Sequence, residues 1–169
     1  MAISERTAQA LSAISALAAS EKNRDTLRKL KSDYDQWSWK AATEDPWHFM
    51  RHFCKTKNEH SQEDDPYQPF PDMEYLRHLL AVWKKVEERP SNRLLLIAKS
   101  RQMMASWFAC AMILWICMSR SAKRVGWQSK KSEDADQMLE RIYGLYNRLP
   151  ESVRQANPCE RKYLSMRFT

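Results

Sequence analysis

The chain has 169 residues and a mass of about 20 kDa, which is the length of one domain or of one domain with a helical arm. Apolar residues make up 43% of it, which argues against wholesale disorder, and 28 Lys and Arg against 21 Asp and Glu give a net charge of +7 that favours anionic partners. Only two glycines are present where average usage predicts about 12, so the composition argues against a turn-rich all-β fold and favours helices.

The first 44 residues are predicted to form an N-terminal helical arm. Residues 4–20 are rich in alanine, and residues 21–38 carry one apolar helical face made of Leu27, Leu30, Tyr34 and Trp37. Two packed helices are the simpler interpretation of this arm. A docking arm for another subunit is the alternative, because two short helices bury little apolar surface by themselves.

The next elements are predicted from capping and breaking residues. Asp45 and Pro46 are a favourable N-cap and first helical residue, so they predict a helix that continues through Cys54. The polar and proline-containing stretch 55–72 is predicted to be a loop. Residues 73–86 are predicted to form a further helix, because their leucines and one tryptophan recur on a single helical face.

The second half of the chain alternates strand and helix patterns. Short apolar or alternating runs predict strands at 93–98, 123–129 and 163–168, with helices at 106–120 and 132–149 between them. This order implies βαβ units and a parallel sheet flanked by helices. Since the sequence ends on the last predicted strand, the sheet is expected to be incomplete.

The connector after the first predicted strand is the candidate binding site. In βαβ folds, phosphates bind where a strand leads into the N-terminus of the next helix. Compared with the phosphate loop G-x-x-x-x-G-K-[ST], only Ser106 matches, while Met104 stands at the second glycine and Ala105 at the lysine. Lys99 and Arg101 nevertheless bring two positive charges to this place. The alternative, equally favoured, is that both side chains point into solvent and bind nothing.

Residues 45–150 resemble the ATPase segment of the large subunit of tailed-bacteriophage terminases, the DNA-packaging motors. The matching pieces are, in order, Asp45-Pro-Trp-His-Phe, Pro69-Phe-Pro, Tyr75-Leu-Arg-His-Leu-Leu, Leu95-Leu-Ile-Ala-Lys-Ser-Arg-Gln-Met-Met-Ala-Ser-Trp107, Ser129-Lys-Lys-Ser-Glu-Asp-Ala135 and Tyr146-Asn-Arg-Leu-Pro150. The resemblance implies a RecA-like P-loop ATPase whose first part is residues 45–169, behind the arm of residues 1–44.

The resemblance also implies roles for individual residues around bound ATP and Mg²⁺. Lys99 matches a lysine that has moved to the front of the phosphate loop, Arg101 a catalytic arginine coupled to the γ-phosphate, and Ser106 the hydroxyl that binds Mg²⁺. Tyr75 and Gln68 are the candidates for holding adenine. The remaining loop residues implied in nucleotide binding are Ser100, Gln102, Met103, Met104 and Ala105.

The same resemblance predicts the activity and the partners of the whole protein. ATP hydrolysis would drive double-stranded DNA into a procapsid in the cytoplasm of an infected bacterial host. The motor would be a homo-oligomer that works with the small terminase subunit and the portal. The Walker B carboxylates and the nuclease domain would follow Thr169, so this segment alone is expected to bind ATP without turning it over efficiently.

Two other classes of function stay open at this stage. One is a non-catalytic protein- or DNA-binding module that retains a degenerate phosphate loop, and the other is a different P-loop translocase or helicase.

A zinc site at His48, His52 and Cys54 is not favoured, because no further ligand cluster is in register. The longest apolar run, residues 107–118, is too short to span a membrane. The four cysteines form no paired framework, which favours a reduced cytoplasmic setting.

Overall fold

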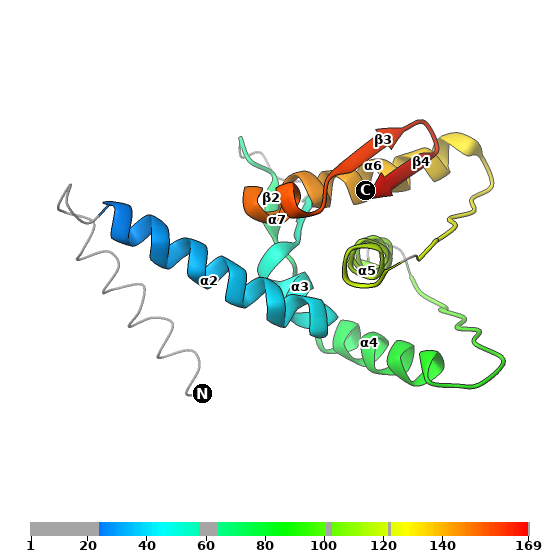
Figure 1. The fold of residues 1–169 in the computed structure, drawn as a ribbon. Helices are drawn as coiled ribbons and strands as arrows, with labels where there is room; N and C mark the ends of the chain where they lie inside the picture. Colours follow the sequence, from blue (N-terminus) through cyan, green and yellow to red (C-terminus); the bar gives the residue numbers. More distant parts are fainter. Residues whose placement is uncertain (1–23, 58–63, 101–102, 122, 169) are drawn as a thin grey trace. The chain divides into compact units, whose positions relative to one another are not determined.

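The computed structural model describes residues 24–57, 64–100, 103–121 and 123–168. The chain divides into two compact units, residues 1–40 and residues 41–169. The described residues are mostly helical, and their strands form two small antiparallel pairs (Figure 1).

Helix α2, Arg24–Glu44, supplies the described part of the first unit and runs on into the second. Leu30, Tyr34 and Trp37 on this helix are exposed, Trp37 at 65%, whereas Leu27 and Trp39 are half-buried. The rings of Tyr34 and Trp37 lie 6.1 Å apart, as residues three positions apart on a helix do. The predicted helix over residues 21–38 is therefore confirmed from Arg24 onward, whereas the predicted helix over residues 4–20 lies outside the described residues.

Helix α3, Pro46–Phe53, begins at the predicted cap. The Asp45 carboxylate accepts hydrogen bonds from the backbone N–H groups of Trp47 and His48, both at 3.2 Å. Pro46 fits the first helical position, where a backbone N–H has no partner inside the helix. α3 then buries Phe49, Met50 and Phe53 in the core.

A small hairpin follows α3 where the sequence predicts only a loop. Strand β1, Lys55–Lys57, pairs antiparallel with strand β2, Tyr67–Pro69, and Thr56 is buried between its exposed neighbours. The pairing continues through the N–H of Phe70, which donates to the carbonyl of Cys54 at 3.1 Å. The sequence did not predict these strands, because the stretch is polar and each strand has only three residues.

Helix α4, Glu74–Glu87, confirms the predicted helix over residues 73–86. It buries Leu76, Leu80 and Val86 along one face. At its C-terminal end Glu87 forms an ion pair with Arg120, whose guanidinium also lies 5.0 Å from the centre of the Trp115 ring.

Helix α5, Ala105–Ser119, is apolar on nearly all sides, as predicted for residues 106–120. Figure 1 looks down its axis, with α4 on one side and helix α6, Ser132–Asn147, on the other. The side chains that α5 buries are Phe108, Cys110, Ala111, Met112, Leu114 and Trp115. No helix in the described part of the chain combines the length and the apolar character needed to cross a membrane.

The chain ends in a short helix and a second hairpin. Helix α7, Glu151–Ala156, is followed by strands β3, Cys159–Lys162, and β4, Ser165–Phe168, which pair antiparallel. Arg161 fastens this hairpin to α6 through the carboxylates of Asp136, at 2.6 Å, and Glu140, at 3.0 Å.

The predicted parallel sheet of a RecA-like P-loop domain is wrong for the described residues. Residues 93–98 and 123–129 form no strand, because neither pairs with a neighbouring strand. The strand predicted at 163–168 forms in part, as β4, and turns back on β3. Apolar runs give the side-chain pattern of a strand, but a strand exists only when a neighbour pairs with its backbone. The exposed side chains of the two unpaired segments include Leu94, Leu96, Ile97, Val125 and Trp127.

Candidate functional site

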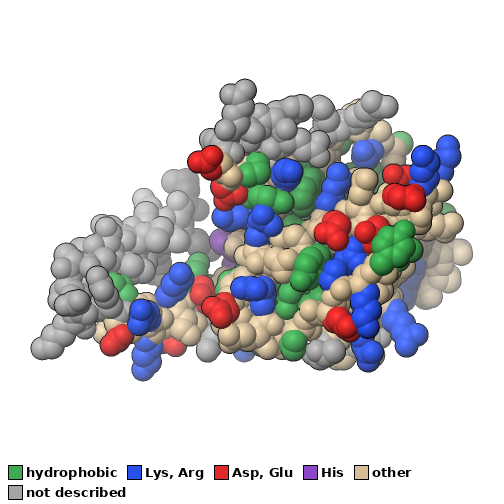
Figure 2. All heavy atoms as spheres, turned by 90° about the horizontal axis from the view of Figure 1, so that it is seen from above, with side chains coloured by type: hydrophobic (Ala, Val, Ile, Leu, Met, Phe, Trp, Pro, Cys, Tyr) green, Lys and Arg blue, Asp and Glu red, His purple; other side chains and the backbone are tan. Residues whose placement is uncertain are grey.

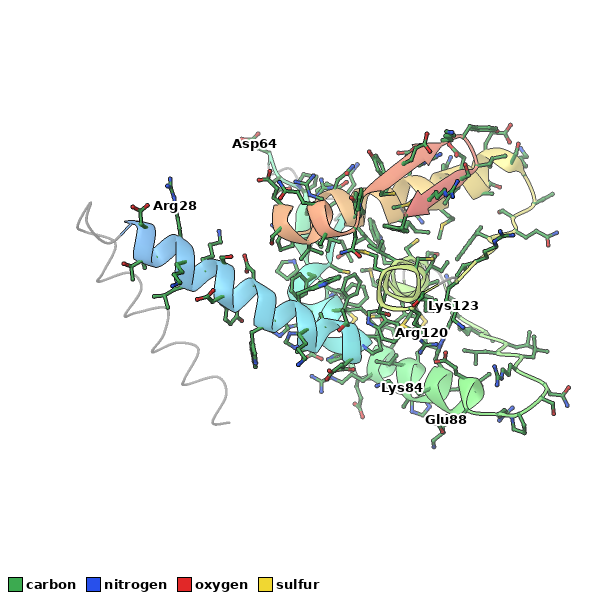
Figure 3. The ribbon with its side chains drawn as sticks, in the orientation of Figure 1. Arg28, Asp64, Lys84, Glu88, Arg120 and Lys123 are labelled. Atoms are coloured by element: carbon green, nitrogen blue, oxygen red, sulfur yellow. The ribbon has the colours of Figure 1, made fainter. Side chains whose placement is uncertain are left out.

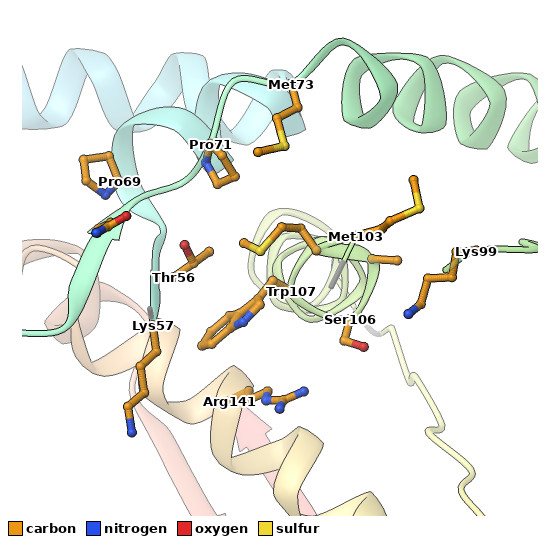
Figure 4. Close-up of a pocket in the computed structure, with 13 residues that line it drawn as sticks. Thr56, Lys57, Pro69, Pro71, Met73, Lys99, Met103, Ser106, Trp107 and Arg141 are labelled. Carbon is orange, nitrogen blue, oxygen red and sulfur yellow. The ribbon is translucent and has the colours of Figure 1, made fainter. Parts of the chain in front are cut away.

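A cavity of about 470 Å³ lies at the N-terminus of α5, and we call it the α5 N-terminal pocket (Figure 4). Its walls come from the β1–β2 hairpin, from Pro71 and Met73 ahead of α4, from Lys99, from the first residues of α5 and from Arg141 of α6. All of these belong to the second unit of the chain. The pocket therefore joins segments that are far apart in the sequence.

Positive charge dominates the lining of this pocket. Lys57, Lys99 and Arg141 contribute to it, and no acidic residue is found among its described lining residues. Lys57 and Lys99 are exposed, whereas Arg141 is half-buried. In Figure 4 the two lysines lie on opposite sides of Trp107, and Arg141 approaches the same ring from α6. Cations arranged around a concave surface raise the local concentration of anions.

The start of α5 adds to this positive character. A helix N-terminus carries backbone N–H groups without partners inside the helix and a partial positive charge. In α5 the residue at the N-cap position, Met104, makes no side-chain cap hydrogen bond, and the first turn holds no acidic residue. An anion in the pocket would therefore meet a helix end that the described part of the protein leaves uncompensated.

Met104 also has the backbone geometry of a glycine. Its φ of 51° and ψ of 4° lie in the left-handed region, which side chains with a Cβ rarely adopt. In a phosphate loop the corresponding position is a glycine, because the chain turns sharply there. The sequence comparison placed Met104 at this position, and the structure shows that the turn is made despite the side chain.

Trp107 supplies a flat apolar wall beside the cations. It is half-buried, and the guanidinium of Arg141 lies 5.7 Å from its ring centre, within the range of a cation–π contact. Arg141 also lies 3.5 Å from the sulfur of Met138 on the same helix. The contact with Trp107 holds the arginine against α5 while it lines the pocket.

The structure gathers many of the residues that the sequence singles out. Those that line the α5 N-terminal pocket are Gln68, Lys99, Met103, Met104, Ala105 and Ser106. Tyr75 lines an adjoining cavity of about 280 Å³ that also includes Lys99, Met103 and Ala105. Ser100 lines neither cavity, although its carbonyl oxygen lies 3.4 Å from Lys99 Nζ. Arg101 and Gln102 lie outside the described residues.

Seven lining residues were not predicted as site residues from the sequence, namely Thr56, Lys57, Pro69, Pro71, Met73, Trp107 and Arg141. Pro69, Pro71 and Trp107 lie in segments that carry the resemblance, so these three residues had a signal in the sequence. Trp107 also directly follows Ser106. Lys57 and Arg141 belong to no motif and reach the pocket only through the fold of the hairpin and of α6.

The histidine pair on α3 forms a separate feature. The rings of His48 and His52 stack with their centres 4.2 Å apart, and burial together with the neighbouring His48 lowers the pKa of His52. Within the described ranges, no group of three or more His, Cys, Asp or Glu side chains is arranged to hold a metal ion.

Charge on the wider surface is mixed. Figure 2 shows Lys and Arg side chains interspersed with Asp and Glu across the face in view, so positive charge is not gathered into one stripe there. Comparison of the chain with family models, with curated proteins and with solved structures finds no match. The pocket's own geometry suits a phosphorylated compound with a flat ring, because it combines cations, a helix N-terminus and an aromatic wall.

Proposed function

We propose that the α5 N-terminal pocket binds ATP with Mg²⁺. The observation that carries this proposal is the convergence of Lys57, Lys99 and Arg141 on the uncapped N-terminus of α5. Three side-chain charges and a helix end together match the charge of a triphosphate, and backbone N–H groups at a helix start are suited to phosphate oxygens. The cavity volume of about 470 Å³ lies within the range of small-ligand sites.

Each lining residue has a role in this proposal. Lys99 and Arg141 neutralise phosphate oxygens, and the hydroxyl of Ser106, in the first turn of α5, is a ligand for Mg²⁺. Trp107 offers a ring face to adenine, and the amide of Gln68 offers a hydrogen-bond donor and an acceptor to the edge of the base.

The sequence resemblance supports a place for this binding in a DNA-packaging motor. We propose that the chain is part of a terminase large subunit that uses ATP to move double-stranded DNA into a procapsid. Its partners would then be further copies of itself, the small terminase subunit and the portal, in the cytoplasm of the bacterial host. The nucleotide site in this proposal needs no parallel sheet, since the pocket is formed by a hairpin, two helices and the connector before α5.

Binding without efficient turnover is the activity proposed for these 169 residues. Phosphoryl transfer requires carboxylates that hold Mg²⁺ and position the attacking water. The described lining of the pocket contains no carboxylate. Hydrolysis would therefore depend on carboxylates supplied from elsewhere in the motor.

Titration of the protein with a fluorescent ATP analogue and Mg²⁺ tests the proposal. Wild-type protein is expected to give a saturable signal that unlabelled ATP and inorganic triphosphate both displace, because the phosphates carry most of the recognition. Lys99→Ala and Arg141→Ala should each weaken binding by about tenfold, the effect of losing one charge-assisted contact. Lys85→Ala is the matched control, since this exposed lysine of α4 carries the same charge and does not line the pocket.

The result also separates the two classes of function. If neither the wild type nor the variants bind the analogue saturably, the proposal fails. The loop would then be a relic within a protein- or DNA-binding module, which the exposed apolar segments 93–98 and 123–129 would favour. Equal weakening by Lys85→Ala would show that overall charge, rather than this pocket, attracts the nucleotide.

A further inference from the structure

A larger cavity, of about 860 Å³, lies toward the other end of α5. It is enclosed by the C-terminal half of α5, by α6, by β4 and by residues 123–125, and we call it the β4 groove. Its apolar side chains include Ile113, Leu114, Leu139, Ile142, Met166 and Phe168. Figure 3 places Arg120 and Lys123 beside α5, where the connection to α6 begins. No residue of the β4 groove lines the α5 N-terminal pocket, so the two sites are separate.

The charges around the β4 groove have one sign. Arg120, Lys123, Arg124 and Arg167 are among its lining residues, and no acidic residue is found in the described lining. Arg120 is already paired with Glu87. Lys123 and Arg124 are exposed, and Lys123 also interacts electrostatically with Glu87. An occupant that carries negative charge beside apolar side chains would therefore complement the groove.

Both walls of the groove also present unpaired backbone. β4 pairs with β3 along one edge, and within the described structure no hydrogen bond joins its other edge to a neighbouring strand. Residues 123–129 make no backbone hydrogen bond to any described residue. Val125 and Trp127 in this segment are exposed, at 42% and 36%. A strand edge with free N–H and C=O groups is a template for a further strand.

We propose that the β4 groove binds an extended segment of a partner protein in which acidic and apolar residues alternate. The segment adds a strand to β4, its backbone pairing with the free edge and its apolar side chains entering between α5 and α6. Its acidic side chains meet Lys123 and Arg124. This inference does not rest on nucleotide binding, because it uses the opposite end of α5 and none of the same residues.

Fluorescence anisotropy with a labelled hexapeptide of alternating Glu and Val tests the proposal on the whole chain. The peptide is expected to bind saturably, and the same peptide with Lys in place of Glu should not. A peptide N-methylated at alternate residues keeps its side chains and loses backbone donors, so it should bind at least about tenfold more weakly. The double variant Lys123→Glu with Arg124→Glu should weaken binding by a similar factor, whereas Lys85→Glu on α4 should leave it unchanged.

The opposite results overturn the proposal. Equal binding of the N-methylated and unmodified peptides would show that no strand is added. Binding of decanoate without binding of any peptide would show that the groove takes a small anionic amphiphile. A dimer in light scattering that Lys123→Glu with Arg124→Glu dissociates, without peptide binding, would show that a second copy of the chain fills the groove. Circular dichroism of each variant confirms that a loss of binding is not a loss of fold.

Discussion

The indole N–H of Trp115 donates a hydrogen bond to the backbone carbonyl of Ala42 at 2.8 Å, and both residues are buried. In a continuous helix the carbonyl of Ala42 would accept from the backbone N–H four residues later, which here is Pro46 and carries no N–H. The indole therefore satisfies a carbonyl that the junction between α2 and α3 leaves without its helical partner.

Replacing this indole should destabilise the protein by more than the loss of side-chain packing alone. Trp115→Phe leaves the buried carbonyl of Ala42 without a donor, which costs about 1–3 kcal/mol of unfolding free energy in addition to the lost packing. Urea unfolding at neutral pH measures the change. Trp83→Phe is the control, because Trp83 is half-buried, packs on Phe108 and makes no hydrogen bond through its indole to a described residue. Equal losses in the two variants would contradict the role given to the bond.

Met104 provides a test of backbone strain. A residue with a Cβ in the left-handed region costs about 1–2 kcal/mol, and glycine avoids this at a cost of about 0.5–1 kcal/mol in the unfolded chain. Met104→Gly should therefore be at least as stable as the wild type. Met104→Ala keeps the strain and loses the side-chain contacts, so its unfolding free energy should be about 1 kcal/mol lower than that of the wild type. Thermal unfolding of the three proteins gives the order, and an alanine variant that equals the glycine variant would contradict it.

The hairpin at the end of the chain should respond to acid through Asp136. The backbone N–H of Leu164, at 3.0 Å, and then Arg161 hydrogen-bond this carboxylate and lower the pKa of Asp136 below its ordinary value. A carboxyl whose pKa is lower in the folded state stabilises the protein above the unfolded-state pKa of about 3.9, and this contribution is lost as the pH falls through the folded-state pKa.

Asp136→Ala should therefore lower the melting temperature at pH 7, and its difference from the wild type should shrink progressively below about pH 4. Melting curves between pH 7 and pH 2 measure this. Glu160→Ala, which removes the exposed ion pair with Lys162, is the control and should have little effect at any pH. A pH-independent difference for Asp136→Ala would show that packing, not the charge, anchors the hairpin.

The four cysteines should react slowly with thiol reagents while the protein is folded. Burial raises the pKa of the Cys110 thiol to about 12 and that of Cys159 to about 11. The pKa of Cys54 is also raised, first by burial and then by the neighbouring Cys110. Because the thiolate is the reactive form, labelling at pH 8 should be at least about tenfold slower than for a free thiol and should become fast in denaturant. Mass spectrometry identifies the order in which the thiols are labelled, and Cys117 and Cys159 should be labelled before the buried Cys54 and Cys110. Rapid native labelling of Cys54 would contradict the buried environment.

Helices were predictable because their signals are local. Asp45 caps α3 and Pro46 begins it through contacts within a few residues, and the apolar character of α5 alone placed it in the core. The strands predicted at 93–98 and 123–129 do not form, because pairing depends on a neighbour that side-chain patterns do not specify. The three-residue strands β1 and β2 are the converse case, since they pair without any apolar run.

The residues of the candidate pocket also fall into those that local sequence predicts and those that only the fold brings together. Ser106 and Lys99 were predicted because they lie in one connector, where Ser106 matches the last position of the phosphate loop and Lys99 matches the lysine that the resemblance implies. Lys57 and Arg141 were missed because a basic residue in a hairpin or on a helix face is indistinguishable in sequence from a solvated one. Only the packing of α6 against α5 brings Arg141 beside Trp107.

The absence of a polar face on α5 has a consequence for synthesis of the protein. The segment leaves the ribosome after α3 and α4 but before α6 exists, so the side of α5 that α6 covers has no internal cover during that interval. Any slowing of translation between codons 120 and 147 would prolong the exposure and lead the nascent chain toward chaperones or aggregation. The order of the elements along the chain thus makes the delay between these two helices the vulnerable moment in production of the molecule.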